Sequence, residues 1–210
     1  MTEVISANAP DAIARAADAM REGRLIAVPT ETVYGLAVLP TQVNLERLIE
    51  AKRRSAEKGI QLIVDSIEQA RAIATLTPLA EALAARFWPG PLTLVLTRRP
   101  DVALPDVLGG GRPTLGLRLP DHCVPRALAR LLGPIAASSA NTSGMPAATT
   151  GEAVLASLGD LVELVIDDGP VRGGVSSTVV ACLPDEPLAM LREGAVSERE
   201  IRAAAATLDD

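Results

Sequence analysis

Short apolar runs that alternate with segments of helical periodicity restrict this chain to an α/β fold. The first runs have the length of buried strands and lie at residues 24–28, 60–64 and 92–96. The segments around them space apolar residues by three and four, which predicts amphipathic helices at 9–23, 43–54, 66–76 and 78–88. Because the apolar runs reach only about seven residues, and a membrane-spanning helix needs roughly 18, we expect no membrane span.

The second half of the chain contains more strands than helices. Strands are predicted at 114–120, 134–139, 161–167, 177–183 and 187–193, and helices at 124–132, 151–159 and 197–208. Ser66 with Gln69 and Ser197 with Glu200 have the spacing of capping boxes, which begin helices. Early alternation followed by clustered strands predicts an open, mixed parallel and antiparallel sheet with flanking helices. Since no repeat or long linker divides the sequence, we expect residues 1–210 to form a single domain.

Composition excludes several classes of protein. The chain is 48% apolar with only 1% aromatic residues, so we expect a core of Ala, Val, Leu and Ile. A net charge of −6 argues against a protein that coats nucleic acid through bulk electrostatics, although a local basic pocket is compatible with it. The two cysteines, Cys123 and Cys182, are too few for a disulfide framework and lack metal-ligand spacing. We expect no bound transition metal, no signal peptide and a cytoplasmic location.

The sequence lacks the common catalytic motifs. It contains no G-x-x-x-x-G-K-[ST] loop, and GGGRPTLG (109–116) does not fit the pattern G-x-G-x-x-G after a strand. The single histidine, His122, lacks the G-x-S-x-G context of a serine hydrolase, and we interpret it as a polar residue at the start of a helix. What remains is a set of hydroxyl groups and cations.

Hydroxyl-rich and basic segments fall at the predicted strand ends or in the loops beside them, where open α/β sheets bind ligands. They lie at residues 29–35, 52–58, 113–122, 138–144, 176–178 and 191–194. Of 20 basic residues only two are lysine, and both occur in KRRSAEK (52–58), which indicates sites that require a compact ammonium group. Several cations in one cleft imply an anionic ligand. A positive pocket of the size of a triphosphate would be formed by Lys52, Arg54, Lys58, Arg118 and Arg192.

The order of several motifs resembles the YrdC-type family: PTETVYGL, KRR with a later K, FWPGPLT, GLRLPDH, SSANTSG, STVV and LREGAVS. The resemblance covers about residues 10 to 202 and is to the single-domain bacterial form, without the C-terminal domain of longer members. It implies a YrdC-like open, twisted mixed sheet with a basic cleft. It also implies threonylcarbamoyl-AMP synthesis, in which L-threonine, bicarbonate and ATP with Mg²⁺ give L-threonylcarbamoyladenylate and pyrophosphate. A tRNA-modifying threonylcarbamoyl transferase complex would then use the adenylate.

The resemblance also implies roles for residues that match the family's motifs. Threonine-binding roles are implied for Thr32, Arg118, Ser177 and Ala137, and Arg118 would hold the substrate carboxylate through two hydrogen bonds. ATP-binding roles are implied for Lys52, Arg54, Lys58, Thr114, Ser139, Asn141, Ala147 and Arg192. Lys52 and Arg54 are also expected to act in catalysis by neutralising charge, since phosphate chemistry of this kind needs no covalent nucleophile. Glu31 and Tyr34 would shape the wall beside threonine, unless Tyr34 is a packed ring whose hydroxyl is satisfied internally.

Three residues depart from the family pattern: Ser55 replaces a usual proline, Ile63 aligns with a histidine of some members, and Ala181 replaces a common aspartate. These departures affect local geometry and remove no cation. The alternatives are a YrdC-like RNA-binding module without adenylate synthesis, a related enzyme that uses carbamoyl phosphate, and an unrelated ATP-dependent ligase. An RNA-binding module would need a broad basic face and stacking aromatic residues. The sequence leaves open the oligomeric state and whether the protein itself contacts tRNA.

Overall fold

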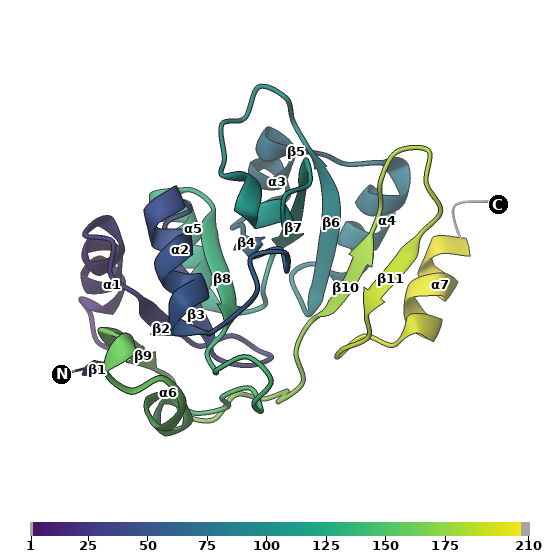
Figure 1. The fold of residues 1–210 in the computed structure, drawn as a ribbon. Coiled ribbons are helices and arrows are strands. Elements are labelled where there is room, and N and C mark those ends of the chain that lie inside the picture. The colour runs from purple at the N-terminus through teal and green to yellow at the C-terminus, as the bar shows by residue number, and fades with distance from the viewer. Residues whose placement is uncertain (1, 207–210) are drawn as a thin grey trace.

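A mixed sheet of eleven strands runs through residues 2–206, the part of the chain that the computed structural model describes. The strands are β1 (Glu3–Ser6), β2 (Ile26–Val28), β3 (Gly35–Val38), β4 (Gln61–Ile63), β5 (Ala74–Thr75), β6 (Leu92–Arg98), β7 (Thr114–Arg118), β8 (Ile135–Ser139), β9 (Leu164–Asp167), β10 (Thr178–Ala181) and β11 (Ala189–Arg192). Their order across the sheet is β1-β9-β2-β3-β8-β4-β7-β6-β10-β11, and β5 pairs with β6. Figure 1 shows β1 and β11 at opposite ends, so the sheet is open.

The pairing directions confirm the predicted mixed sheet. Parallel pairs join β1 to β9, β9 to β2, β4 to β7 and β6 to β10. The remaining pairs are antiparallel, including β3 with β8 and β8 with β4 in the middle of the sheet. Segments far apart in the sequence therefore lie side by side at the centre: β3 and β4 flank β8, and β7 lies on the other side of β4.

Helices lie on both faces of the sheet (Figure 1). They are α1 (Ala12–Arg21), α2 (Gln42–Ala51), α3 (Ile67–Ile73), α4 (Pro78–Phe87), α5 (Cys123–Leu132), α6 (Gly151–Leu158) and α7 (Glu198–Ala206), with 3-10 turns η1 (Asp106–Gly109) and η2 (Gly159–Leu161). The capping box of Ser197 and Glu200 is confirmed, because each side chain accepts a hydrogen bond from the other residue's backbone N–H. None of the helices within residues 2–206 has the length and apolar character to cross a membrane.

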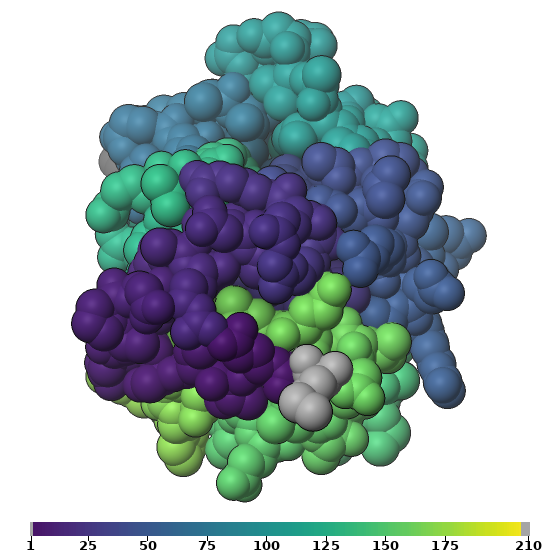
Figure 2. Space-filling view, turned by 90° about the vertical axis from the view of Figure 1, so that its left-hand side faces the viewer, coloured from purple at the N-terminus to yellow at the C-terminus, as the bar shows by residue number. Residues whose placement is uncertain are grey.

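Strand alternation divides the buried side chains into two clusters, one on each face of the sheet. In β2, Ile26 and Val28 pack in the cluster that includes α1 and α5, whereas Ala27 packs in the larger cluster on the other face. Figure 2 shows the end of the molecule at which α1, in purple, covers the surface. The expected aliphatic core is confirmed, since both clusters consist mainly of Ala, Val, Leu and Ile side chains.

The structure adds two strands to those expected from the sequence and shortens two of the predicted helices. No element was expected at residues 35–38 or 3–6, which form β3 and β1. The predicted helix 66–76 ends at Ile73 because Ala74 and Thr75 pair with β6. The predicted helix 43–54 ends at Ala51, because Arg53 adopts φ +50° and turns the chain out of the helix. The basic cluster therefore lies in the loop after α2 and not on the helix.

The central position of β3 gives a prediction about stability. Leu36→Ala removes a fully buried side chain from the middle of the sheet and should lower the free energy of unfolding by about 2–5 kcal/mol. The matched control is Leu131→Ala, because Leu131 is 52% exposed on α5 and its loss should change that energy by no more than about 0.5 kcal/mol. Urea unfolding of both variants checks this, and equal losses would contradict the central role of β3.

Candidate active site

A cleft of about 640 Å³ lies over the middle strands of the sheet. Its floor comes from β4, β7, β6 and β10, and its walls come from β8, β11 and the loops that follow α2 and contain η1. Strand alternation explains the floor: along β7, Thr114, Gly116 and Arg118 face the cleft, whereas Leu115 and Leu117 are buried in the core. The cleft thus runs across the face of the strands and is not confined to their ends, where the sequence led us to expect ligand contacts.

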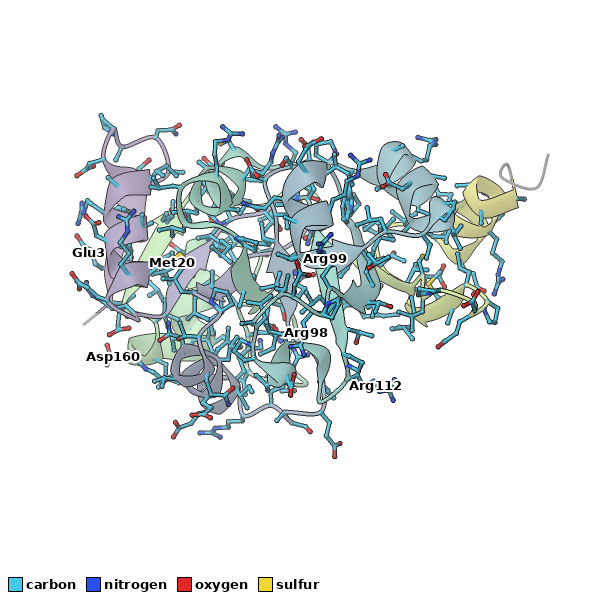
Figure 3. The ribbon with its side chains drawn as sticks, turned by 90° about the horizontal axis from the view of Figure 1, so that it is seen from above. Glu3, Met20, Arg98, Arg99, Arg112 and Asp160 are labelled. Carbon is cyan, nitrogen blue, oxygen red and sulfur yellow. The ribbon has the colours of Figure 1, made fainter. Side chains whose placement is uncertain are left out.

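Two loops meet to form the rim of the cleft. A Cβ atom at Gly110, which adopts φ +64°, would lie 2.2 Å from the carbonyl oxygen of Glu57, so only glycine allows this approach. Ile60 N–H also donates to the carbonyl of Leu108 at 2.8 Å. The rim brings Arg112 to the cleft wall. Figure 3 labels Arg112 near the middle of the molecule, away from Glu3 at the end where α1 lies.

Besides Arg112, three arginines line the cleft from different parts of the chain: Arg54 from the loop after α2, Arg118 from β7 and Arg192 from β11. Arg54 donates to Ser138 Oγ at 2.9 Å and to the carbonyl of Gly59 at 2.6 Å. Arg192, in β11, donates from Nε and Nη2 to the carbonyl of Ser177 at 3.1 and 2.8 Å. Within residues 2–206, neither of these two arginines has a carboxylate partner. Carbonyl and hydroxyl groups orient their charges without neutralising them.

Lowered pKa values of Arg54 and Arg192 indicate that these cations repel their neighbours. Burial, and secondly the charge of Arg192, lowers the pKa of Arg54. Burial, and secondly the charge of Arg118, lowers the pKa of Arg192 in the same way. Both shifts disfavour the charged forms of these side chains. An anion bound between them would remove that penalty, so the arrangement favours an anionic ligand.

Arg118 is the one arginine of this group that has a carboxylate partner. Its Nη2 donates to Glu31 Oε1 at 2.7 Å and to Thr32 Oγ1 at 3.0 Å, and its Nε donates to the carbonyl of Gly90 at 3.2 Å. The ion pair is buried, with side-chain exposures of 3% for Arg118 and 15% for Glu31. The PTET segment and the FWPGPLT motif therefore both fix the guanidinium of Arg118 in place.

Lys52 lies behind the wall of the cleft, at the end of α2. It is 2% exposed, and its ammonium group donates hydrogen bonds to the carbonyl oxygens of Ser139 and Asn141. Burial, and secondly the charge of Arg54, lowers the pKa of Lys52 to about 8. Lys52 thus fixes the SSANTSG loop, and its ammonium group loses its proton at a lower pH than that of an exposed lysine.

Buried polar atoms without partners gather around the cleft. Three of the four such side-chain atoms found in the described part of the chain are Glu31 Oε2, Arg54 Nε and Asn141 Oδ1. An unpaired buried polar atom costs on the order of 1–3 kcal/mol, so native proteins rarely keep them without a reason. Their concentration here supports a polar ligand or ordered water at this place.

The structure brings seven of the residues singled out in the sequence to the cleft: Arg54, Thr114, Arg118, Ala137, Ser139, Ser177 and Arg192. Five others lie outside its lining: Thr32, Lys52, Lys58, Asn141 and Ala147. Of these, Thr32, Lys52 and Asn141 contact lining residues or their loop through hydrogen bonds. The side chain of Lys58 is exposed.

Sequence reasoning missed several residues that face the cleft. Among them are Gln61, Thr93, Arg112 and Glu57. Gln61 and Thr93 are single polar residues within the apolar runs IQLIV and LTLVL, and this interruption was the available signal. A polar side chain in a buried strand needs a partner or a ligand, and these two residues bond to each other at 2.8 Å.

Tyr34 and His122 have structural roles near the site. Tyr34 is fully buried, its single hydroxyl proton is shared between Asp167 Oδ1 and the carbonyl of Gly169, and its oxygen accepts from the N–H of Asp168. Burial is the first cause that raises the pKa of Tyr34. His122 accepts a hydrogen bond from Val124 N–H at the start of α5, as predicted for a helix-start residue.

Comparison with known proteins identifies relatives along nearly the whole chain. The model of the Sua5/YciO/YrdC family, described as telomere recombination, matches residues 18–194. The threonylcarbamoyl-AMP synthase of Bacillus subtilis is 39% identical over 206 residues, which cover 97% of this chain and 59% of that protein. The threonylcarbamoyl-AMP synthase of Vibrio cholerae serotype O1 is 38% identical over 160 residues, which cover 73% of this chain and 83% of that protein.

A solved structure matches the fold closely. The crystal structure of Sua5 from Pyrococcus abyssi complexed with L-threonine superposes with a TM-score of 0.88 at 38% sequence identity. The match covers 97% of this chain and 60% of that chain. This chain therefore spans about three fifths of the length of the B. subtilis and P. abyssi relatives.

The buried ion pair gives a prediction about the site itself. Glu31→Gln keeps the shape of the side chain and leaves the buried charge of Arg118 without its counterion, so the free energy of unfolding should fall by about 1–3 kcal/mol. Glu57→Gln is the matched control, because Glu57 is an exposed carboxylate on the same cleft and should contribute no more than about 0.5 kcal/mol. Urea unfolding measures both, and equal effects would show that the ion pair does not stabilise the fold.

Proposed function

This chain belongs to the Sua5/YciO/YrdC family, and we propose that it joins L-threonine, bicarbonate and ATP to form L-threonylcarbamoyladenylate and pyrophosphate. The observation that carries the proposal is the basic cleft, in which the half-buried Arg54 and the more exposed Arg192 are oriented by carbonyl groups without a carboxylate partner. Such a site is suited to a polyphosphate, because only an anionic ligand neutralises it. A cleft of about 640 Å³ also lies within the size range of sites for small ligands.

The proposed chemistry proceeds in two steps. The amine of threonine adds to CO2, formed from bicarbonate, and gives an N-carboxylate with loss of a proton. An oxygen of this carboxylate then attacks the α-phosphorus of ATP, and the bond to the β-phosphate oxygen breaks to release pyrophosphate. Negative charge grows on the phosphate oxygens during the second step, so fixed cations close to them lower the barrier.

Each cation receives a separate role in this proposal. Arg54 and Arg192 would bind the phosphates of ATP, with Thr114 and Ser139 as further contacts on the nucleotide. Lys52 would add its charge from behind the wall, through the loop that it holds. Arg118 would bind the carboxylate of threonine, beside Ser177 and Ala137.

The residues outside the cleft lining would act through others. Thr32 would orient Arg118, with which it shares a hydrogen bond of 3.0 Å. Asn141 would hold the loop in shape, since its Nδ2 donates to the carbonyl groups of Thr142 and Met145, and Ala147 follows in the same segment. Lys58 would reach the outer phosphates only if its exposed side chain turned toward the cleft.

Magnesium would enter with the nucleotide. The described residues contain no group of three or more His, Cys, Asp or Glu side chains that could hold a metal ion. We therefore propose that the phosphates of ATP supply the main ligands of Mg²⁺.

We further propose that residues 1–210 act as one domain, since one sheet passes between both buried clusters. The adenylate would be passed to a transferase complex that modifies tRNA. The RNA-binding alternative is less well supported, because the chain has three aromatic residues and Tyr34 is fully buried. A cytoplasmic location stays a prediction.

Pyrophosphate release tests the proposed reaction directly. The purified chain with ATP, Mg²⁺, bicarbonate and L-threonine should release pyrophosphate, and omission of either threonine or bicarbonate should stop the release. Release that continues without threonine would indicate a different ATP-dependent activity. No release from protein that binds ATP would favour the RNA-binding module, which a gel shift at physiological salt would then examine.

Two neighbouring arginines provide a matched test of the phosphate site. Arg54→Gln should weaken ATP binding at least about tenfold, because a charge-assisted hydrogen bond contributes roughly 1.5–3 kcal/mol. Arg53→Gln removes the same charge from the adjacent exposed position and should leave ATP affinity nearly unchanged. Isothermal titration calorimetry with ATP measures both affinities. Equal losses would mean that net charge, rather than the position of Arg54, determines binding.

The lowered pKa of Lys52 predicts a pH dependence of ATP binding. Since the pKa of Lys52 in the free protein is about 8, its positive charge is lost as the pH rises above that value. ATP affinity should therefore fall between about pH 8 and 9.5, over which the phosphates of ATP stay fully ionised. Lys52→Met carries no charge to lose, so its weaker ATP affinity should stay constant over the same range. A parallel decline in both proteins would assign the pH dependence to another group.

A further inference from the structure

The floor of the cleft carries a row of three polar side chains from three separate segments. Gln61 comes from β4, Thr93 from β6, and Ser177 from the residue before β10. Thr93 and Ser177 are each 2% exposed, so they lie at the bottom of the cleft. The resemblance gave a role to Ser177 alone, and nothing yet explains why Gln61 and Thr93 interrupt apolar strands at this place.

Hydrogen bonds connect the row in one direction. Arg192 Nη2 donates to Ser177 Oγ at 3.2 Å, Ser177 Oγ and Thr93 Oγ1 lie 2.9 Å apart, and Thr93 Oγ1 donates to Gln61 Oε1 at 2.8 Å. Thr93 donates its only hydroxyl proton to the amide oxygen of Gln61, which can only accept. The hydrogen bond between Thr93 and Ser177 must therefore be donated by the Ser177 hydroxyl. Both hydroxyl protons are thus engaged within the row.

The direction of these hydrogen bonds determines which donors and acceptors of the row remain unused. Each hydroxyl oxygen accepts one hydrogen bond and donates one, which leaves one lone pair on Thr93 and one on Ser177. Gln61 takes part in the row through its Oε1 only, so the two N–H groups on its Nε2 can donate to a ligand. The bottom of the cleft therefore offers hydroxyl acceptors at its centre and an amide donor at one end.

Gly116 leaves the row accessible to a ligand. It lies in β7, between the strands of Gln61 and Thr93, and faces the cleft. A Cβ atom at this position would sit 3.5 Å from Thr93 Cγ2 and 3.7 Å from the Cα of Gln61. Any larger side chain would rise into the space over the row, whereas glycine leaves that space to a ligand.

The row lies close to the proposed carboxylate site. Arg118 faces the same side of β7 two residues beyond Gly116, which corresponds to about 7 Å along the strand. An amino acid whose carboxylate binds Arg118 can therefore extend its side chain toward the row. A side-chain hydroxyl would donate to a free lone pair there, whereas a methyl group in its place would leave the buried acceptors unpaired.

We propose that the row of Gln61, Thr93 and Ser177 recognises the side-chain hydroxyl of the amino-acid substrate and selects a β-hydroxy amino acid over an apolar one of equal size. This inference rests on the proposed function, since it assigns the selectivity of the same site. Thr93 acts as a positioning residue that fixes the hydroxyl of Ser177, and Gln61 fixes that of Thr93. A site built to bind a hydroxyl group discriminates strongly against the analogue that lacks it.

The test compares L-threonine with L-valine, which replaces the hydroxyl by a methyl group of similar size. In the unmodified protein, kcat/KM for adenylate formation should be far higher with threonine than with valine. Thr93→Val keeps the shape of the side chain and breaks the row, so the threonine-to-valine ratio should fall at least about tenfold at unchanged ATP affinity. Thr93→Ser keeps the hydroxyl and should retain most of the ratio.

The matched control is Thr97→Val, which makes the same change on the same strand outside the cleft lining and should leave the ratio unchanged. If Thr93→Val folds and keeps the threonine-to-valine ratio, the row does not recognise the side-chain hydroxyl of the substrate. If Thr93→Val does not fold, Gln61→Leu provides the second test, with the same expected loss. Absence of adenylate from the unmodified protein with any amino acid would instead overturn the proposed function, and titration of threonine by calorimetry would then test the row alone.

Discussion

The partial desolvation of guanidinium groups that lack matching carboxylates is the constraint on which the rest of the site depends. Removing a charge from water is costly, and Arg54 and Arg192 recover only part of that cost from carbonyl and hydroxyl groups. The repulsion between neighbouring arginines adds to it. A polyanion bound between these arginines would offset both costs. Arg118 differs because Glu31 is its ion-pair partner, so it adds less unbalanced positive charge to the cleft.

One alternation of side chains produces both the core and the cleft. In β7, leucines enter the core from one face while Thr114, Gly116 and Arg118 face the cleft from the other. Helices cover the core face, and the cleft face is left open between the rim loops and β11. The neighbours of Arg118 then fix its direction, since Thr32 and Gly90 come from separate loops that converge on it. The precision of the site thus comes from strands and from the loops that the strands hold.

Sequence reasoning identified the mixed sheet and many of the charged residues, and its failures have physical causes. β3 was missed because it is only four residues long and begins with Gly35, a residue that strands disfavour, directly after the hydroxyl-rich segment PTETVY. Lys52 could not be placed from the sequence, because the end of α2 depends on the positive φ of Arg53 and the position of Lys52 depends on the carbonyl groups of another loop. Gln61 and Thr93 were missed because only the sheet order, set by long-range pairing, brings β4, β7 and β6 side by side.

Isotopically labelled bicarbonate tests the central claim, that this cleft joins threonine, bicarbonate and ATP in one product. The protein would be incubated with ATP, Mg²⁺, L-threonine and the labelled bicarbonate, and the nucleotides analysed at once by mass spectrometry. We expect an adenylate that contains both threonine and the labelled carbon, with one pyrophosphate formed for each adenylate. An adenylate without the label, or cleavage of ATP without any threonine adduct, would contradict it.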